Sequence, residues 1–227
     1  MHNIKKNFTI KKIIITSLFI ALACLSHELS KYLFIYPLKM PWGRSLFQIS
    51  VFILLLSGHL LGWKNSFIIC FFYTIYHVMK SFSHYLINNE TLFNFEFNQK
   101  FGIILLDYII PDLSISLYGL FYRADLKHLE NKKRIAYNFF FVLFFRNFFY
   151  FCSSYFIFVD TIIHKSSVLT TEANILVRFL LKILQHSPLL FCFLYNYIPF
   201  VITYFLNLIF MIYFSTYIKQ IQKEYLN

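Results

Sequence analysis

Two carboxylates, Asp107 and Asp112, lie inside the apolar stretch LLDYIIPDLSISLYGLFYR at positions 105–123, which is long enough to cross a lipid bilayer. A charge at hydrocarbon depth costs at least ~2.5–3.5 kcal/mol, so such a group normally faces a cavity or a charged partner. On a straight helix, Ser114 and Tyr118 project within roughly 20° of Asp107 and form a polar stripe with it. The sequence therefore predicts that Asp107 faces a small-molecule site. The alternative is a carboxylate satisfied by a neighbouring helix.

An arginine in a later apolar run could supply that neighbouring charge. Arg146 lies within the stretch 135–158, four residues before Tyr150. Because a guanidinium keeps its charge when buried, pairing Arg146 with Asp107 or Asp112 would relieve both partners.

The spacing of the two carboxylates disfavours acid–base catalysis. Five positions on a straight helix separate their directions by about 140°, so they share one site only if Pro111 kinks the helix. The G-K-[ST] signature of a nucleotide-binding P-loop does not occur in the sequence. We therefore expect no catalytic residues and no enzyme activity.

The composition is that of an integral membrane protein. Of 227 residues, 59% are hydrophobic and 14% are charged, whereas soluble domains carry about 25% charged residues. The net charge of +11 gathers in the clusters at 5–12, 123–134 and 219–223. That is the pattern of short cytoplasmic segments and not of a nucleic-acid partner. Abundant Phe, Ile, Asn, Lys and Tyr, which have A/T-rich codons, suggest the plasma membrane of a bacterium with an A/T-rich genome.

The sequence suggests no metal site, cofactor or disulfide. The four cysteines, Cys24, Cys70, Cys152 and Cys192, all lie in apolar runs and lack metal-ligand spacing. His77 and His84 are seven positions apart in another run, so a metal site there would need ligands from elsewhere.

Six membrane spans with both termini in the cytoplasm give the simplest all-α topology. We expect them at about 13–33, 46–60, 66–87, 101–122, 135–158 and 188–217, in one membrane domain without internal repeats. Ser17 and Ala21 have the small-xxx-small spacing that lets another helix approach closely. Trp42, in the loop after the first span, is either an interfacial anchor or part of a lid over a pocket.

Three local patterns add detail. Gly58 and Gly62 form a GxxxG, but the segment GHLLGWKN favours a turn at the cytoplasmic face. Glu28 and Lys31 have the spacing of an intrahelical ion pair. The stretch 175–184, ILVRFLLKIL, predicts a short amphipathic helix on the membrane surface.

Three segments together resemble the thiamine-specific S component of energy-coupling-factor (ECF) vitamin transporters. They are KMPWGRSLFQ at 39–48, LLDYIIPDLSISLYGLFYR at 105–123 and SPLLFCFLYN at 187–196. Their order and spacing agree with that family, and the resemblance covers most of 13–217. It implies a six-helix bundle that binds its vitamin without chemistry. It also implies three partner chains: a transmembrane coupling protein, which Ser17 and Ala21 would contact, and two ATPase subunits.

The resemblance also implies roles for individual residues. Asp107 matches the acid that contacts the cationic vitamin, and Trp42 lies in the loop that closes over it. The other implied binding residues are Tyr108, Arg146, Tyr150, Tyr195 and Asn196. The sequence departs from the family pattern at Tyr150, where the family usually has a histidine, and at Leu189, where it has a tryptophan.

A carboxylate beside aromatic faces suits the flat, cationic rings of thiamine, since each cation–π contact contributes ~0.5–2 kcal/mol. Uptake of thiamine as an S component is therefore the expected function. The departures keep open a thiamine precursor or another vitamin as ligand. Two further alternatives are a membrane-embedded enzyme using Asp107 and Asp112, and a secondary carrier that works without ATPases.

Overall fold

The computed structural model describes residues 2–33, 47–87, 97–122, 131–159, 163 and 175–221, and nearly all of them are helical. Five helical segments are long and apolar enough to cross a membrane: Ile10–Ser30, Ile49–Ser81, Phe97–Phe121, Lys132–Phe158 and Pro188–Phe214. The prediction of an all-α architecture is confirmed, and these five segments have the length and apolarity that membrane spans need.

Helix α1 (His2–Leu33) leads to helix α2 (Ile49–Ile87), which folds back on itself at Gly62. Gly62 has φ 74° and ψ 175°, a conformation that favours glycine. The Ser57 and Ser66 hydroxyls lie 3.3 Å apart, and Tyr73 donates to Ser50 at 3.0 Å. A straight helix would hold Ser50 and Tyr73 about 35 Å apart, so the two arms of α2 run antiparallel. The predicted turn in GHLLGWKN is confirmed, and the two arms correspond to the apolar segments expected at 46–60 and 66–87.

The third apolar segment is not a regular helix. It consists of α3 (Phe97–Ile103), a π-helical turn η2 (Ile104–Ile109), α4 (Ile110–Ser114) and a 3-10 segment η3 (Ile115–Phe121). Within it, the Ile110 N–H donates to the Leu105 carbonyl, five residues back. Pro111, which has no N–H to donate, follows directly. Because π and 3-10 turns change the angle per residue, the straight-helix projection used for Asp107 and Asp112 does not hold here.

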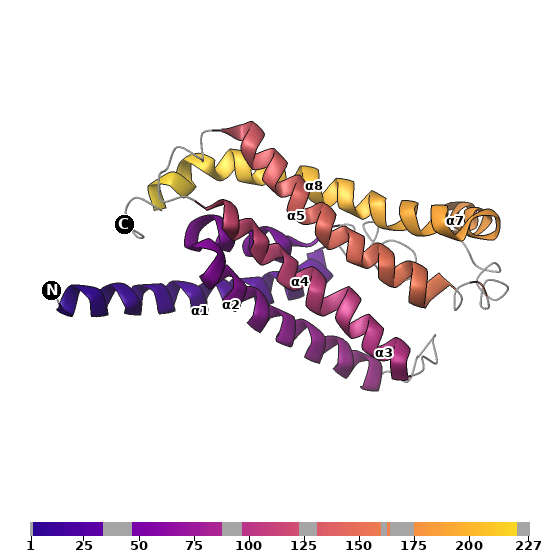
Figure 1. Cartoon of the computed structure of the whole chain (residues 1–227), viewed down its shortest axis with the longest axis horizontal. Coiled ribbons are helices and arrows are strands. Elements are labelled where there is room, and N and C mark those ends of the chain that lie inside the picture. The colour runs from indigo at the N-terminus through magenta and orange to yellow at the C-terminus, as the bar shows by residue number, and fades with distance from the viewer. Residues whose placement is uncertain are drawn as a thin grey trace.

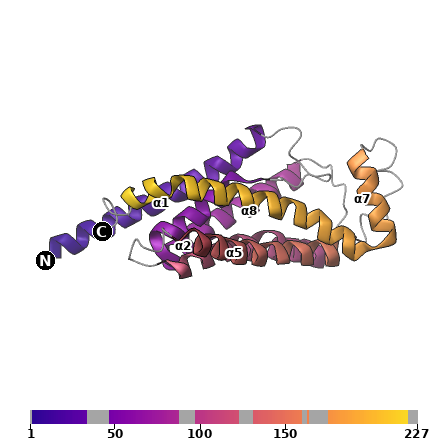
Figure 2. The ribbon, with the colours of Figure 1, turned by 90° about the horizontal axis from the view of Figure 1, so that it is seen from above.

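Helix α5 (Lys132–Ser153) continues into a π-helical turn, η5 (Ser154–Phe158), and α8 (Pro188–Ile221) packs beside it. Figure 1 shows that the start of α1 and the described end of α8 lie at the same end of the bundle, which we call the terminal end. The turn of α2 and the start of α5 also lie there. The short helix α7 (Ile175–His186) lies at the opposite, far end, as Figure 2 also shows.

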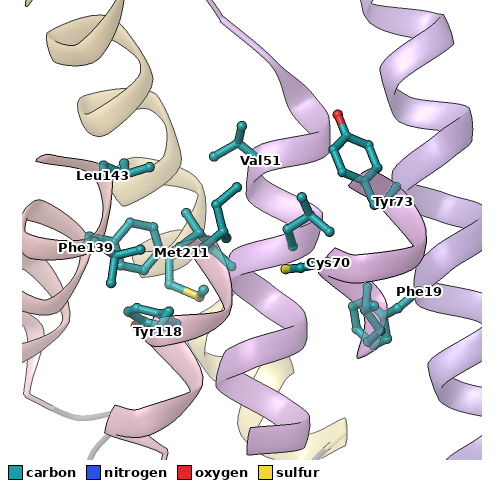
Figure 3. Close-up of a cluster of buried hydrophobic side chains, with 14 of the residues drawn as sticks. Phe19, Val51, Cys70, Tyr73, Tyr118, Phe139, Leu143 and Met211 are labelled. Atoms are coloured by element: carbon teal, nitrogen blue, oxygen red, sulfur yellow. The ribbon is translucent and has the colours of Figure 1, made fainter. Parts of the chain in front are cut away.

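The middle of the bundle is filled by apolar side chains of α1, both arms of α2, η3, α5 and α8. Figure 3 shows Val51, Phe139 and Met211 filling the space between these helices, with the Tyr73 hydroxyl pointing away from the cluster. All three of these side chains are at most 1% exposed. In lipid, such packing and not the exclusion of water holds neighbouring helices together.

At the terminal end, three glycines bring two backbones into contact, and we call this contact the glycine crossing (Gly58, Gly62 and Gly119). A Cβ on Gly119 would lie 2.5 Å from the backbone N and Cα of Trp63 and 2.8 Å from the carbonyl carbon of Gly62. A Cβ on Gly58 would lie 3.0 Å from the Gly119 nitrogen. Only residues without a side chain allow η3 to approach the α2 turn this closely.

Helix α7 forms as the amphipathic pattern predicts. Its Leu180, Leu181 and Leu184 are buried against Val159, Phe191 and Cys192, while Phe179 on the same helix is 58% exposed. This apolar face therefore packs on the ends of α5 and α8. At least part of the α7 face that the sequence predicts to lie on the membrane contacts the protein instead.

Candidate functional site

The most deeply buried charge in the described part of the chain is Asp112, whose exposed fraction is 0%. Its Oδ2 lies 2.7 Å from Nδ1 of His77 on the second arm of α2. Its Oδ1 lies 3.7 Å from Nη2 of Arg146 on α5. Three separate helical segments thus bring an acid, an imidazole and a guanidinium together inside an apolar bundle. We call this group and the side chains linked to it the polar cluster.

Arg146 is held from three sides. It donates from Nη2 to Oε1 of Gln48 at 3.0 Å, and its Cζ lies 4.9 Å from the centre of the Tyr150 ring. Its third neighbour is Asp112, so the structure decides which acid the arginine pairs with: Asp112, not Asp107. Asp112 Oδ1 and Arg146 Nε are buried and make no hydrogen bond to any residue that the structure describes. Buried polar atoms in proteins rarely lack a hydrogen-bond partner.

His77 links this pair to α1. Its ring centre lies 4.7 Å from that of His27 and 4.8 Å from that of Tyr108, both in edge-on contact. His27 Nδ1 is 3.0 Å from the Tyr73 hydroxyl, which donates in turn to Ser50 at 3.0 Å. The polar cluster is therefore a connected network that crosses from α4 through both arms of α2 to α1.

A second charged contact joins the same helices. Glu28 on α1 accepts hydrogen bonds from Tyr76 and from Lys80, both on the second arm of α2. The structure pairs Glu28 with Lys80, whereas the side chain of Lys31, its expected intrahelical partner, lies outside the described residues. The antiparallel return of α2 places Lys80 beside α1, and nothing in local spacing indicates that contact.

Asp107 lies in the π-helical turn η2 and is half-buried, whereas its neighbour Tyr108 reaches the polar cluster through its contact with His77. The buried members of the expected stripe, Ser114 and Tyr118, are 5% and 2% exposed. Ser114 and Tyr118 are therefore buried as Asp112 is, whereas Asp107 is half-buried. The π-helical turn η2 and the 3-10 segment η3 change the angle per residue, so the stripe that a straight helix would form is not kept.

The two predicted residues of α8 lie close to the end of α5. Asn196 is 1% exposed and donates from Nδ2 to the Ser154 hydroxyl at 2.9 Å and to the Cys192 carbonyl at 2.7 Å. Tyr195 stacks on Phe191 with ring centres 5.7 Å apart. Ser154 follows Tyr150 by four residues, about one helical turn, so Asn196 joins α8 to the segment that continues from Arg146 and Tyr150.

The remaining predicted residues fall into two groups. Ser17 and Ala21 are exposed on α1. Trp42 lies outside the described residues, as does the side chain of His84.

Three members of the polar cluster were missed as site residues: Asp112, His77 and His27. Tyr73 and His77 are four positions apart, a spacing that places them on one face of a helix, and the sequence shows two acids in one span. It did not show that the His77 stripe faces Asp112, because that contact joins residues 35 positions apart.

No group of three or more potential metal ligands gathers among the residues that the structure describes, and all four cysteines are free. No protein-family model matches this sequence, and a search of curated proteins finds no match. The fold and site together define a multi-pass helical membrane protein with a charged, aromatic-lined cluster inside the bundle.

Proposed function

We propose that this chain is the substrate-binding S component of an ECF-type transporter, and that it binds thiamine or a related cationic ring compound. The observation that carries the proposal is the polar cluster itself. Asp112, His77 and Arg146 meet inside an apolar bundle, in contact with the Tyr108 and Tyr150 rings. Ionisable groups at membrane depth are costly and typically mark the path or site of a ligand. Asp107 is half-buried beside Tyr108, and it is the acid to which the resemblance assigns contact with a cationic vitamin.

The surroundings suit a flat ring. The Tyr108 ring contacts His77, and the Tyr150 ring contacts Arg146, so both partners of Asp112 have an aromatic neighbour. Asp112 Oδ1 and Arg146 Nε are a buried acceptor and a buried donor that a ligand's amino group and ring nitrogen would satisfy. Once a lid excludes water, the attraction between Asp107 and a cation strengthens, because the effective dielectric constant falls.

The proposed topology has six crossings, with the two arms of α2 as the second and third, and with both termini in the cytoplasm. The antiparallel fold at Gly62 and the shared end of α1 and α8 support it (Figure 1). The exposed lysines at the terminal end, among them Lys11, Lys64 and Lys132, agree with a cytoplasmic face. The polar cluster would then open to the outside, where a vitamin arrives. Exposed Ser17 and Ala21 would remain available to the coupling protein.

Binding to the purified chain in lipid nanodiscs tests the proposal. Thiamine and its isolated pyrimidine half are titrated by calorimetry into the wild type and into Asp107→Asn. We expect thiamine to bind, and Asp107→Asn to weaken it by about 10–100-fold, the equivalent of one charge-assisted contact of about 1.5–3 kcal/mol. The uncharged pyrimidine half should lose less than about threefold, because it lacks the thiazolium charge. Failure of both ligands to bind the wild type contradicts the proposed pocket.

One observation favours a different ring compound over thiamine itself. Tyr150 stands where the resembling family usually has a ligand-contacting histidine, and its ring is engaged by the Arg146 guanidinium. A ligand that prefers a tyrosine face or hydroxyl at this point would reverse the order of affinities. The second candidate is therefore an S component for a thiamine precursor or another vitamin. Tighter binding of the pyrimidine half than of thiamine would support it.

A further inference from the structure

His77 joins the charged pair of the polar cluster to helix α1. Its Nδ1 lies 2.7 Å from Oδ2 of Asp112, and its side chain is 11% exposed, whereas that of Asp112 is fully buried. Because a carboxylate accepts hydrogen bonds and does not donate them, Asp112 fixes Nδ1 of His77 as a donor. The nitrogen left to take a further proton is Nε2, which makes no hydrogen bond to any residue that the structure describes. His77 can therefore take up one proton inside the bundle.

Titratable and charged groups face His77 from each segment packed against it. The ring of His27 on α1 lies 4.7 Å from that of His77, and the ring of Tyr108 in η2 lies 4.8 Å from it. Tyr73, on the same arm of α2, lies at 5.6 Å. With the Asp112 pair and its aromatic neighbour, the described groups around His77 are His27, Tyr73, Tyr108, Asp112, Arg146 and Tyr150. Among these side-chain types, only histidine ordinarily changes its charge between pH 5 and 8.

A proton on His77 would lie beside the place where we expect the ligand cation, so this inference rests on the proposed function. Asp112 and Tyr108 border the proposed pocket, and both contact His77. Beyond His27, Glu28 and Lys80 pair with each other. Two positive charges repel more strongly in an apolar interior than in water, because the effective dielectric constant is lower. The proton and the ligand cation therefore oppose each other's binding, although they occupy different atoms.

We propose that His77 is a proton site that competes with the cationic ligand, so that ligand binding releases up to one proton and weakens as the pH falls. The direction follows from charge: His77 is neutral at the higher pH, and at the lower pH its added positive charge repels the ligand. Since only this added charge matters, the direction is the same whatever charge the half-buried Asp107 contributes. Acidic and histidine side chains linked inside a membrane bundle typically mark such proton sites.

Calorimetry on the full chain in lipid nanodiscs tests this competition. Thiamine is titrated at pH 8 and at pH 6, beside an isosteric analogue that has carbon in place of the thiazolium nitrogen and is uncharged. One linked proton changes affinity by at most about tenfold per pH unit, and we expect the wild type to bind thiamine about tenfold more weakly at pH 6. The analogue should change less than about threefold, since it lacks the repelled charge. It shares the pyrimidine of thiamine, so titration of the ligand itself affects both equally.

Proton release is measured directly in the same experiment. Binding at pH 7 is repeated in buffers of different ionisation enthalpy, which gives the number of protons exchanged per ligand. We expect a net release of up to one proton with thiamine and none with the uncharged analogue. This comparison uses the wild type alone, so it stands even where a histidine variant does not fold.

Two variants assign the proton to a residue. His77→Gln keeps a side chain that donates to Asp112 but takes no proton in this range, so thiamine affinity should differ by less than about threefold between pH 6 and pH 8. His59→Gln is the matched control, because His59 is also buried but stacks on Tyr118, outside the polar cluster. It should keep the wild-type dependence on pH.

The possible failures are distinguishable. Absence of thiamine binding at both pH values overturns the proposed function, and this inference with it. Binding that is equal at pH 6 and pH 8, or equally pH-dependent for the uncharged analogue, overturns this inference alone. So does a His77→Gln variant that keeps the wild-type dependence.

Discussion

The polar cluster and the glycine crossing hold together different parts of one bundle by opposite means. In the polar cluster, Asp112, His77 and Arg146 meet through charge and hydrogen bonds among apolar helices. At the glycine crossing, Gly119 and the α2 turn meet through direct backbone contact, with no side chain between them. Such a contact stabilises helix packing in lipid without burying any charge, since small residues allow close approach.

In the polar cluster, by contrast, charged groups must be removed from water, which costs free energy. A buried ion pair is often replaced by apolar residues of similar volume without loss of stability, so stability alone does not explain its presence. The two regions therefore differ in kind. The glycine crossing is a packing contact, and the polar cluster is the place where we propose that the ligand binds.

The largest expected effect comes from removing one partner of the buried pair. Asp112→Leu leaves the Arg146 guanidinium buried without its acid and should lower the free energy of unfolding by about 3–5 kcal/mol. Thermal or denaturant unfolding in detergent measures it.

The matched control for this change removes both charges at once. Asp112→Leu combined with Arg146→Met should recover most of the stability but not ligand binding. A double variant as unstable as the single one would show that the cluster is structural, and the contrast between the two regions would disappear.

The glycine crossing should tolerate no side chain. Gly119→Val places atoms within 3 Å of the Trp63 backbone, which cannot move aside as a side-chain end can, and should cost about 3 kcal/mol of unfolding free energy. Gly102→Ala is the control, because its Cβ meets only the end of the Ile157 side chain. It should cost about 1 kcal/mol or less. Equal losses would mean that the crossing is not the point of closest packing.

A smaller effect is expected from the hydrogen-bond chain behind the cluster. Tyr73→Phe removes the hydroxyl that joins His27 to Ser50 and should cost about 1–2 kcal/mol, as for a buried hydrogen bond. Tyr213→Phe, at a side chain that is 71% exposed, should change the same unfolding measurement by less than about 0.5 kcal/mol. If the Tyr73→Phe variant is as stable as its control, the hydrogen bonds from His27 through Tyr73 to Ser50 do not contribute to the stability of the polar cluster.

The smallest effect on stability is expected on the exposed face of α1. Ala21→Leu should change the free energy of unfolding by less than about 0.5 kcal/mol, because this side chain is exposed on α1. If the coupling protein docks there, the same change should abolish uptake in cells while leaving ligand binding intact. Phe205→Leu, on the exposed face of α8, is the control and should leave uptake unchanged. Normal uptake by Ala21→Leu would move the partner contact elsewhere.

Local sequence was a good guide to the helices and turns. The α2 turn was predicted because Gly62 lies in a segment that breaks an apolar run, and only glycine adopts its φ of 74° without strain. The amphipathic α7 was predicted from its own periodicity. These features depend on residues within one or two turns of each other, so a linear reading suffices.

The site was only partly predictable. The sequence indicated that Asp107, Asp112 and Arg146 need partners inside the bundle, but not which acid Arg146 would meet. The projection that favoured Asp107 assumed a regular helix, and the π-helical and 3-10 turns around Pro111 change the phase of the segment. Asp112 therefore meets Arg146, and Asp107 stays at a half-buried position.

By itself the sequence determined that this chain forms apolar helices, where α2 turns, and that ionisable groups lie at membrane depth. Those properties follow from composition and short-range spacing. Only the tertiary structure decided that Glu28 meets Lys80, 52 positions away, and that Gln48 holds Arg146, 98 positions away. The physical reason is that a buried charge needs a partner but does not specify it. Helix phase and the packing of distant segments determine which of the possible partners it meets.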